Sequence, residues 1–233
     1  MATVTLGIQT VSTSNTNSYA SGSFTPALND LLVVVVNASG SVHTSAPGSI
    51  TDSQGLGFTK LTSGGYNSGA DSIWVFVANK LAANSSMTVT FDCTGDNATA
   101  CVVGVFRVSG GDGTYIRQVA VGSGAAASAP SATFPVAANT NNCIIAVAGN
   151  GANPAALTAP GSFAEIGDTG VNTPPTGQEA ANRNSGHTSA TVTWGANSGT
   201  AWGAAIIEVY TSGQGAMPDC CSGTGYYGSM VEV

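Results

Sequence analysis

Charged side chains are scarce in this sequence. Only 5 Lys and Arg and 12 Asp and Glu occur among 233 residues, so 7% of the chain is charged, against roughly 25% in an ordinary soluble domain. Five basic residues cannot neutralise the run of phosphates that a nucleic acid presents, so we expect no nucleic-acid partner. The supply of acids, bases and nucleophile activators is also thin, which favours a non-enzymatic protein without metal or cofactor.

Long apolar segments and a leader are also missing. No segment reaches the roughly 18 consecutive apolar residues of a membrane span. The start of the chain has no basic region and no long apolar stretch, so we expect neither a secretory signal nor a membrane partner. Helical periodicity is absent, whereas 42% of residues are hydrophobic and Gly is abundant at 31 residues. Together these features predict an ordered all-β protein rather than a disordered chain.

Five short segments recur in the same order in the two halves of the chain. The matched segments are 8–24 with 117–134, 29–36 with 141–148, 46–50 with 159–163, 86–91 with 189–194, and 102–108 with 203–209. Five collinear matches predict two copies of one unit. We therefore assign residues 1–213 to a β-sandwich, with repeat one at about 3–111, repeat two at about 113–213, and a C-terminal tail at 214–233. Residues 51–56 look like an insertion in the first copy.

Each copy is expected to contain seven short strands, separated by Gly, Pro and Asn turns. Residues 31–36 and 73–77 are apolar at every position, which predicts central strands covered on both faces. Residues 87–91 alternate apolar side chains with Thr, which predicts one buried and one solvated face. The expected strands are 3–11, 20–25, 30–38, 57–62, 71–79, 86–92, 100–109, 115–122, 131–137, 142–149, 162–167, 176–183, 188–194 and 200–211. This pattern predicts a two-sheet antiparallel β-sandwich of jelly-roll type, with two tandem small sandwiches as the alternative.

The five cysteines form no metal-binding pattern, because no CxxC pair and no Cys/His spacing indicates zinc. Cys93 and Cys101 flank a turn between two strands, where a disulfide is geometrically possible. Two half-buried thiols are an equal alternative at these positions. Cys143 opens an apolar run and is expected to pack as a small hydrophobic side chain.

The carboxylates and histidines match no catalytic motif. A glycosidase needs two carboxylates that face each other across a cleft. Glu165, Glu179 and Glu208 are the candidates on strands, but no pair stands out, and Glu208 aligns with Arg107 of the first copy. A hydrolase that uses Glu179 or Asp168 is a third possibility for the function.

Two other groups of polar residues have simpler explanations. Asp92, Asp96 and Asn97 carry the oxygen ligands that calcium prefers, yet ordinary turn chemistry explains them better. His43 and His187 do not occupy equivalent repeat positions, and we expect both to be polar loop residues.

Four aromatic side chains bear on carbohydrate binding, because sugar-binding sandwiches stack pyranose rings on Trp or Tyr. Trp194 occupies the inward position of Phe91, and Trp74 lies within an apolar run, so both are expected in the core. Tyr66 and Trp202 remain as possible glycan contacts.

The C-terminal tail has no counterpart after the first copy. It would expose Met, Tyr and Cys side chains as a free segment, so we expect it to dock on a neighbouring subunit. The possible subunit contacts are Met217, Cys220, Cys221, Tyr226, Tyr227 and Met230.

The order of these segments resembles a known group of proteins. The segments are NDLLVVVV at 29–36, a Pro-Gly turn, GFTKL at 57–61, IWVFVANK at 73–80, a Thr-Val-Thr strand and VVGVFRVSG at 102–110, repeated in weaker form. This pattern resembles the Gly/Ser/Thr-rich duplicated β-sandwich proteins of tailed-phage virions and bacterial surfaces. The resemblance implies a non-enzymatic structural or adhesive role.

The resulting expectation is a virion structural protein, a capsid decoration (cement) or fibre-like protein that is assembled in the host cytoplasm. Its partners would be other virion proteins and further copies of itself. The alternative is a carbohydrate-binding module at a cell surface.

Overall fold

The protein is all-β with antiparallel sheets in the computed structural model, which confirms the expected β-sandwich class. The structure describes residues 2–40, 48–93, 97–151, 157–195 and 199–211. The first eight strands are β1 (Thr3–Ser12), β2 (Ser18–Ala20), β3 (Leu31–Ser39), β4 (Ser49–Asp52), β5 (Phe58–Tyr66), β6 (Asp71–Ala78), β7 (Val89–Asp92) and β8 (Ala100–Ser109). The next seven are β9 (Gly111–Gly124), β10 (Ser131–Thr133), β11 (Cys143–Asn150), β12 (Ala164–Asn172), β13 (Pro175–Arg183), β14 (Thr191–Thr193) and β15 (Trp202–Thr211).

Helical structure within these ranges is limited to one 3-10 turn, η1 (Asn67–Gly69). No helix of the described chain has the length and apolar character needed to cross a membrane.

The strands form two units with a similar plan. Unit one (β1 to β8) contains a five-stranded inner sheet, β1-β8-β3-β6-β5, and a three-stranded outer sheet, β2-β7-β4. Unit two (β9 to β15) contains a five-stranded inner sheet, β9-β15-β11-β13-β12, and a two-stranded outer sheet, β10-β14. The inner sheets thus have the same strand order along the chain. The jelly-roll topology and the origin of the units by duplication stay predictions.

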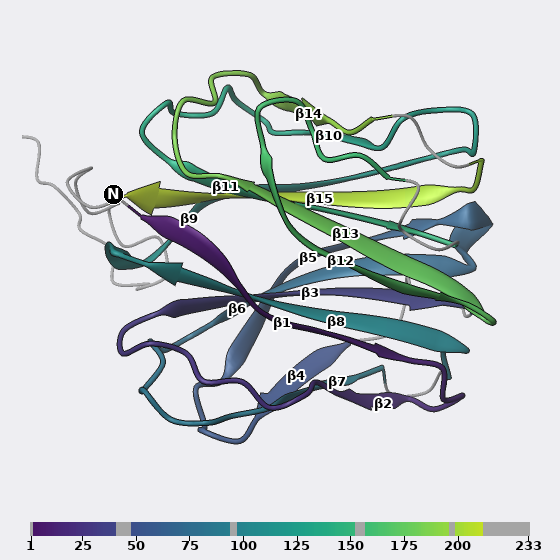
Figure 1. Cartoon of the computed structure of the whole chain (residues 1–233), viewed down its shortest axis with the longest axis horizontal. Helices are drawn as coiled ribbons and strands as arrows, with labels where there is room; N and C mark the ends of the chain where they lie inside the picture. Colours follow the sequence, from purple (N-terminus) through teal and green to yellow (C-terminus); the bar gives the residue numbers. More distant parts are fainter. Residues whose placement is uncertain (1, 41–47, 94–96, 152–156, 196–198, 212–233) are drawn as a thin grey trace, which may run out of the picture.

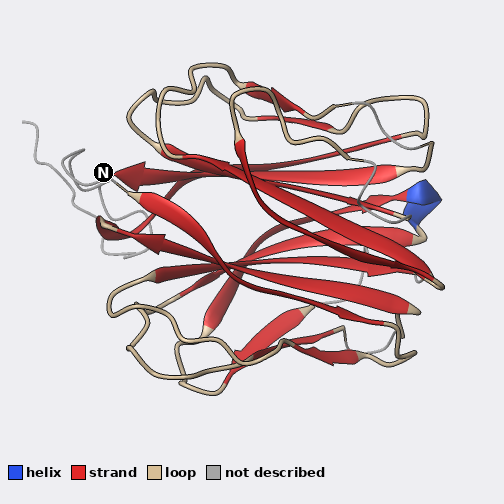
Figure 2. Cartoon of the chain, viewed as in Figure 1, coloured by secondary structure: helices blue, strands red, loops and turns tan. Residues whose placement is uncertain are grey.

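The four sheets are stacked in layers, with the inner sheets facing each other at the centre (Figure 1 and Figure 2). Three hydrophobic cores fill the spaces between the layers. The unit-one core joins outer and inner sheet one, the inter-unit core joins the inner sheets, and the unit-two core joins inner and outer sheet two. Each inner sheet is therefore covered on both faces.

Strand β3 shows why its sequence is apolar at every position. Leu32, Val34 and Val36 point into the unit-one core, and the alternate residues point into the inter-unit core. All nine β3 residues are buried. The expectation of a central strand covered on both faces is confirmed.

Strand β4 lies partly in the expected insertion. It pairs with β7, so that Ile50 faces Phe91, and it gives outer sheet one a third strand. Outer sheet two has no described strand in the corresponding place. The outer sheet of unit one is therefore one strand wider than the outer sheet described for unit two.

The four edge strands of the inner sheets are irregular. A register shift interrupts the pairing of β1, β5, β9 and β12 with their neighbours. The pairings of the central strands β3 and β11 continue without a shift.

Candidate functional site

A row of buried amides crosses the interface between the two units. Gln178 of β13 donates to the Val35 carbonyl oxygen at 3.2 Å and to Asn37 Oδ1 at 2.7 Å. Gln9 Nε2 of β1 donates to Gln178 Oε1 at 2.9 Å. Asn182 Nδ2 donates to the Val4 carbonyl oxygen at 3.1 Å. These bonds fix the register of the two inner sheets, because a shift would leave buried amides without partners.

Two glycines make room for these amides. A Cβ atom at Gly104 would lie 2.3 Å from Gln178 Oε1, and a Cβ atom at Gly149 would lie 1.8 Å from Asn37 Nδ2. Each amide therefore occupies space that a side chain on the facing sheet would fill.

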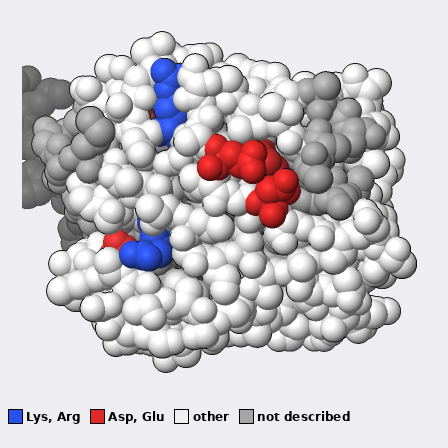
Figure 3. Space-filling model, viewed as in Figure 1, with Lys and Arg blue, Asp and Glu red and all other residues white. Residues whose placement is uncertain are grey.

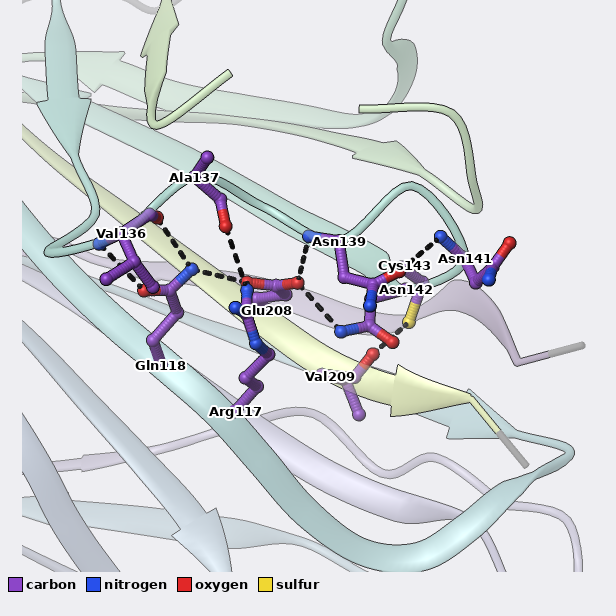
Figure 4. A network of polar contacts seen from close by, with 10 residues as sticks. All are labelled: Arg117, Gln118, Val136, Ala137, Asn139, Asn141, Asn142, Cys143, Glu208 and Val209. Atoms are coloured by element: carbon purple, nitrogen blue, oxygen red, sulfur yellow. Dashed lines mark hydrogen bonds and ion pairs between the residues drawn. The ribbon is translucent and has the colours of Figure 1, made fainter. Parts of the chain in front are cut away.

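A carboxylate in each unit ties the chain before the third strand to the inner sheet. In unit one, Asp30 Oδ2 accepts from the Ala27 backbone N–H at 2.8 Å and from Arg107 Nε at 2.7 Å. In unit two, Glu208 Oε1 accepts from the Asn139 backbone N–H at 2.8 Å and from Asn142 Nδ2 at 2.7 Å, and Arg117 donates to Glu208 Oε2 (Figure 4).

The two networks occupy matching places. Asn139 and Asn142 each follow Ala27 and Asp30 by 112 residues. Glu208 faces Ile144 across the strand pair, just as Arg107 faces Leu32. The acid is supplied by the turn in unit one and by the strand in unit two. Glu208, a candidate catalytic residue, is thus fully buried in a contact that holds a loop.

All five basic residues of the chain make contacts within it. Arg107 and Arg117 pair with the buried carboxylates. Arg183 donates to the carbonyl oxygens of residues 185 and 186, and Lys80 Nζ donates to the Gly55 carbonyl oxygen. Lys60 Nζ lies 5.1 Å from the centre of the Trp74 ring.

Three carboxylates share the outer face of β12 and β13 in unit two. Asp168 faces Glu179 across the strand pair, and Glu165 faces Ala181 on the same side. Glu165 and Asp168 are exposed, whereas Glu179 is fully buried. Acidic side chains gather in one patch over these strands in Figure 3. We call Glu165, Asp168 and Glu179 the acidic face.

Two carboxyl groups of the acidic face, those of Glu179 and Asp168, have raised pKa values. Burial raises the pKa of Glu179 to about 8, opposed by the hydrogen bond from Trp194 Nε1 and assisted by the charges of Glu165 and Asp168. Partial burial raises the pKa of Asp168, and the charge of Glu165 adds to this. The structure thus brings Glu165, Asp168 and Glu179 together and leaves Glu208 apart from them.

The expectation that Tyr66 and Trp202 serve as exposed glycan contacts is wrong, because both side chains are buried, at 3% and 4% exposure. Tyr66 packs against β15 of unit two, where a Cβ atom at Gly203 would lie 2.6 Å from its ring. Trp202 covers Gly124 and donates to Ser128 Oγ at 3.1 Å. Neither ring offers a free face for stacking on a sugar.

A hollow nevertheless opens beside these two aromatic residues, at one end of the stack of sheets. The hollow has a volume of about 680 Å³, and Tyr66 contributes to its lining. Its polar lining residues are Asn67, Ser68, Ser123 and Thr200.

Of the two alternatives left open for Cys93 and Cys101, the structure contains the thiols, because both side chains are buried and no disulfide joins them. Cys93 Sγ donates to the Asn17 carbonyl oxygen at 3.4 Å. Burial raises the pKa of Cys101, so its thiol rarely ionises to the reactive thiolate. Cys143 is buried in the inter-unit core, as expected of a small hydrophobic side chain.

The remaining predicted residues are partly outside the described ranges. His187 lies in a loop, but it is buried against Phe163, with ring centres 5.4 Å apart. Within the described residues, no three His, Cys, Asp or Glu side chains are placed to hold a metal ion. Asp96 and His43 lie outside those residues. The six tail residues expected at a subunit contact also lie outside them: Met217, Cys220, Cys221, Tyr226, Tyr227 and Met230.

Comparison with protein-family models and with curated proteins finds no match to this chain.

Proposed function

We propose that this chain is a non-enzymatic structural protein of a phage virion, a capsid decoration or fibre-like protein that packs on neighbouring subunits. The observation that carries the proposal is the use of its charged groups. All five basic residues and the buried carboxylates Asp30 and Glu208 have contacts that hold loops or cover the core. These contacts lie within the chain and hold its loops against the sheets, which supports a structural role.

The layered plan supports the same role. Two units share a hydrophobic core and a row of buried amides, so they form one block. The irregular edge strands discourage uncontrolled sheet-to-sheet pairing, which is a hazard for a protein present at high local concentration. The scarcity of charge leaves a surface of small polar side chains suited to packing against other proteins.

The reading frames beside this one in its genome provide the first test. The proposal predicts frames for capsid, portal or tail proteins on both sides. Neighbouring frames that encode only metabolic enzymes or polysaccharide-degrading enzymes would contradict a virion role.

The hollow at the end of the stack favours carbohydrate binding as a second candidate function. Its volume of about 680 Å³ falls in the range of small-molecule sites, and its hydroxyl and amide lining suits an uncharged sugar. A glycan array tests this candidate, with Ser123→Phe as a variant that fills the hollow. Binding that this variant removes would support the candidate, whereas no binding, or binding unaffected by it, would count against it.

A further inference from the structure

The acidic face of unit two corresponds to a different cluster in unit one. Both β5 and β12 have a register shift at the same place, between Lys60 and Thr62 and between Glu165 and Gly167. When these two shifts are matched, Glu165 takes the place of Lys60. Asp168 then takes the place of Ser63, and Glu179 that of Trp74.

The cluster in unit one contains its own cation. Lys60 lies over Trp74, and the Trp74 and Phe91 rings are 5.7 Å apart. A Cβ atom at Gly48, just before β4, would lie 2.6 Å from Trp74, so the chain entering β4 covers this indole closely. The aromatic pair of unit one is therefore covered by the chain and already has a cation over it.

The cluster in unit two has three acids and no cation. Neither Glu165 nor Asp168 forms an ion pair within the described residues, and all five basic side chains of the protein have contacts elsewhere. Behind these two exposed acids, Glu179 is fully buried, and its Oε1 atom has no hydrogen-bond partner. Trp194 donates to the other oxygen of Glu179, which fixes the buried carboxyl group behind the exposed pair.

We propose that the acidic face binds a Lys or Arg side chain from a neighbouring protein, at the place where unit one carries Lys60. This inference rests on the proposed role as a protein that packs on neighbouring subunits. No three acidic, His or Cys side chains in the described chain are placed to share a metal ion. A long basic side chain can instead reach between two separate carboxylates.

Titration with a pentalysine peptide at low ionic strength tests the proposal. The expected result is binding that shifts the indole NMR signal of Trp194, assigned with Trp194→Phe. Glu165→Gln and Asp168→Asn should each weaken binding at least threefold, and the double variant at least tenfold. Asp92→Asn, which removes one charge from outer sheet one, should change binding less than twofold.

A complementary variant introduces a lysine into the acidic face, at the position that corresponds to Lys60. Glu165→Lys restores the unit-one residue and should abolish pentalysine binding, while the thermal stability stays the same or rises. Equal weakening by Asp92→Asn and the acidic-face variants would show only non-specific attraction and would overturn the proposal. Binding of calcium but not of pentalysine at this face would also overturn it. A chain that is found in virions but fails these tests would retain its proposed function and lose only this inference.

Discussion

At the scale of single residues, the described structure buries three carboxyl groups completely, those of Asp30, Glu179 and Glu208. Asp30 and Glu208 each pair with an arginine, whereas Glu179 forms no ion pair among the described residues, and one of its carboxyl oxygens has no hydrogen-bond partner. Its raised pKa has a consequence for stability. In the unfolded chain this group ionises near its ordinary pKa, whereas in the folded protein it holds its proton up to about pH 8.

The free energy of unfolding should therefore fall as the pH rises from about 4.5 to about 8. Below the lower value the group is protonated in both states, and its contribution is fully present. A shift of this size corresponds to roughly 5 kcal/mol at most. Glu179→Gln should flatten this part of the pH dependence, as measured by urea unfolding at pH 5 and pH 8. Asp92→Asn, which removes a carboxylate from unit one, serves as the control; equal slopes for wild type and Glu179→Gln would refute the assignment.

Substitution of the buried amide Gln178 should lower the stability of the folded protein. Gln178→Met keeps the volume but leaves the Val35 carbonyl, the Asn37 side chain and Gln9 without this partner. The loss should be about 2–4 kcal/mol in the free energy of unfolding, measured by denaturant titration. Gln54→Met, which removes an exposed bond to the Ser85 carbonyl oxygen, should cost less than about 1 kcal/mol. Equal losses in both variants would show that the amide row does not hold the units together.

At the scale of elements, the edge strand β1 departs from the strict alternation of side chains that a regular strand would show. In β1, Leu6 belongs to the inter-unit core and Ile8 to the unit-one core. Strict alternation would place both on one face. The register shift between Leu6 and Ile8 sends them to opposite faces, so one edge strand contributes to two cores.

Deleting Gly7 tests this explanation. Without the extra residue, Leu6 and Ile8 would be adjacent, and alternation alone would place them on opposite faces. Both side chains should then keep their core contacts, and we expect little change in the melting temperature. Deletion of Thr5 instead turns Val4 away from the inter-unit core, and it should lower the melting temperature by roughly 10 °C. A Gly7 deletion that melts as low as the Thr5 deletion would contradict the role of the shift.

Much of this element-level structure could be predicted from the sequence. The apolar run of β3 and the alternation of β7 specify burial by local pattern, and the structure confirms both predictions. The core positions of Trp74 and Trp194 followed from the apolar run and the repeat match. The burial of Tyr66 and Trp202 is not predictable in this way, because a strand of the other unit covers Tyr66 and Trp202 packs on Gly124 of β9. No local pattern reveals which distant segment will cover a side chain.

At the scale of the whole molecule, the shared inter-unit core makes the two units interdependent. Phe91→Ala opens a cavity in the unit-one core and should cost about 3–5 kcal/mol. If the units unfold together, the NMR signals of Trp74 in unit one and Trp194 in unit two should disappear at the same lowered temperature. Two separate transitions, with the Trp194 signal unaffected, would show that the units are independent.

The same scale explains the difference between the two units. In unit one, Lys60 lies over the aromatic cluster, whereas in unit two the carboxylates of the acidic face have no cation beside them among the described residues. If the acidic face binds a basic side chain as proposed, this asymmetry would orient the protein on its neighbour. The sequence shows only part of this asymmetry. The expected strands 57–62 and 162–167 match Lys60 with Glu165, whereas the matching places of Trp74 and Glu179 follow from the register of β5 with β6 and of β12 with β13.

Quantitative mass spectrometry of purified virus particles tests the central claim most directly. The proposed function predicts that this chain is present in a fixed copy number per particle, in constant ratio to the major capsid or tail protein after gradient purification. A chain that is abundant in the infected-cell lysate but missing from the purified particles would contradict it.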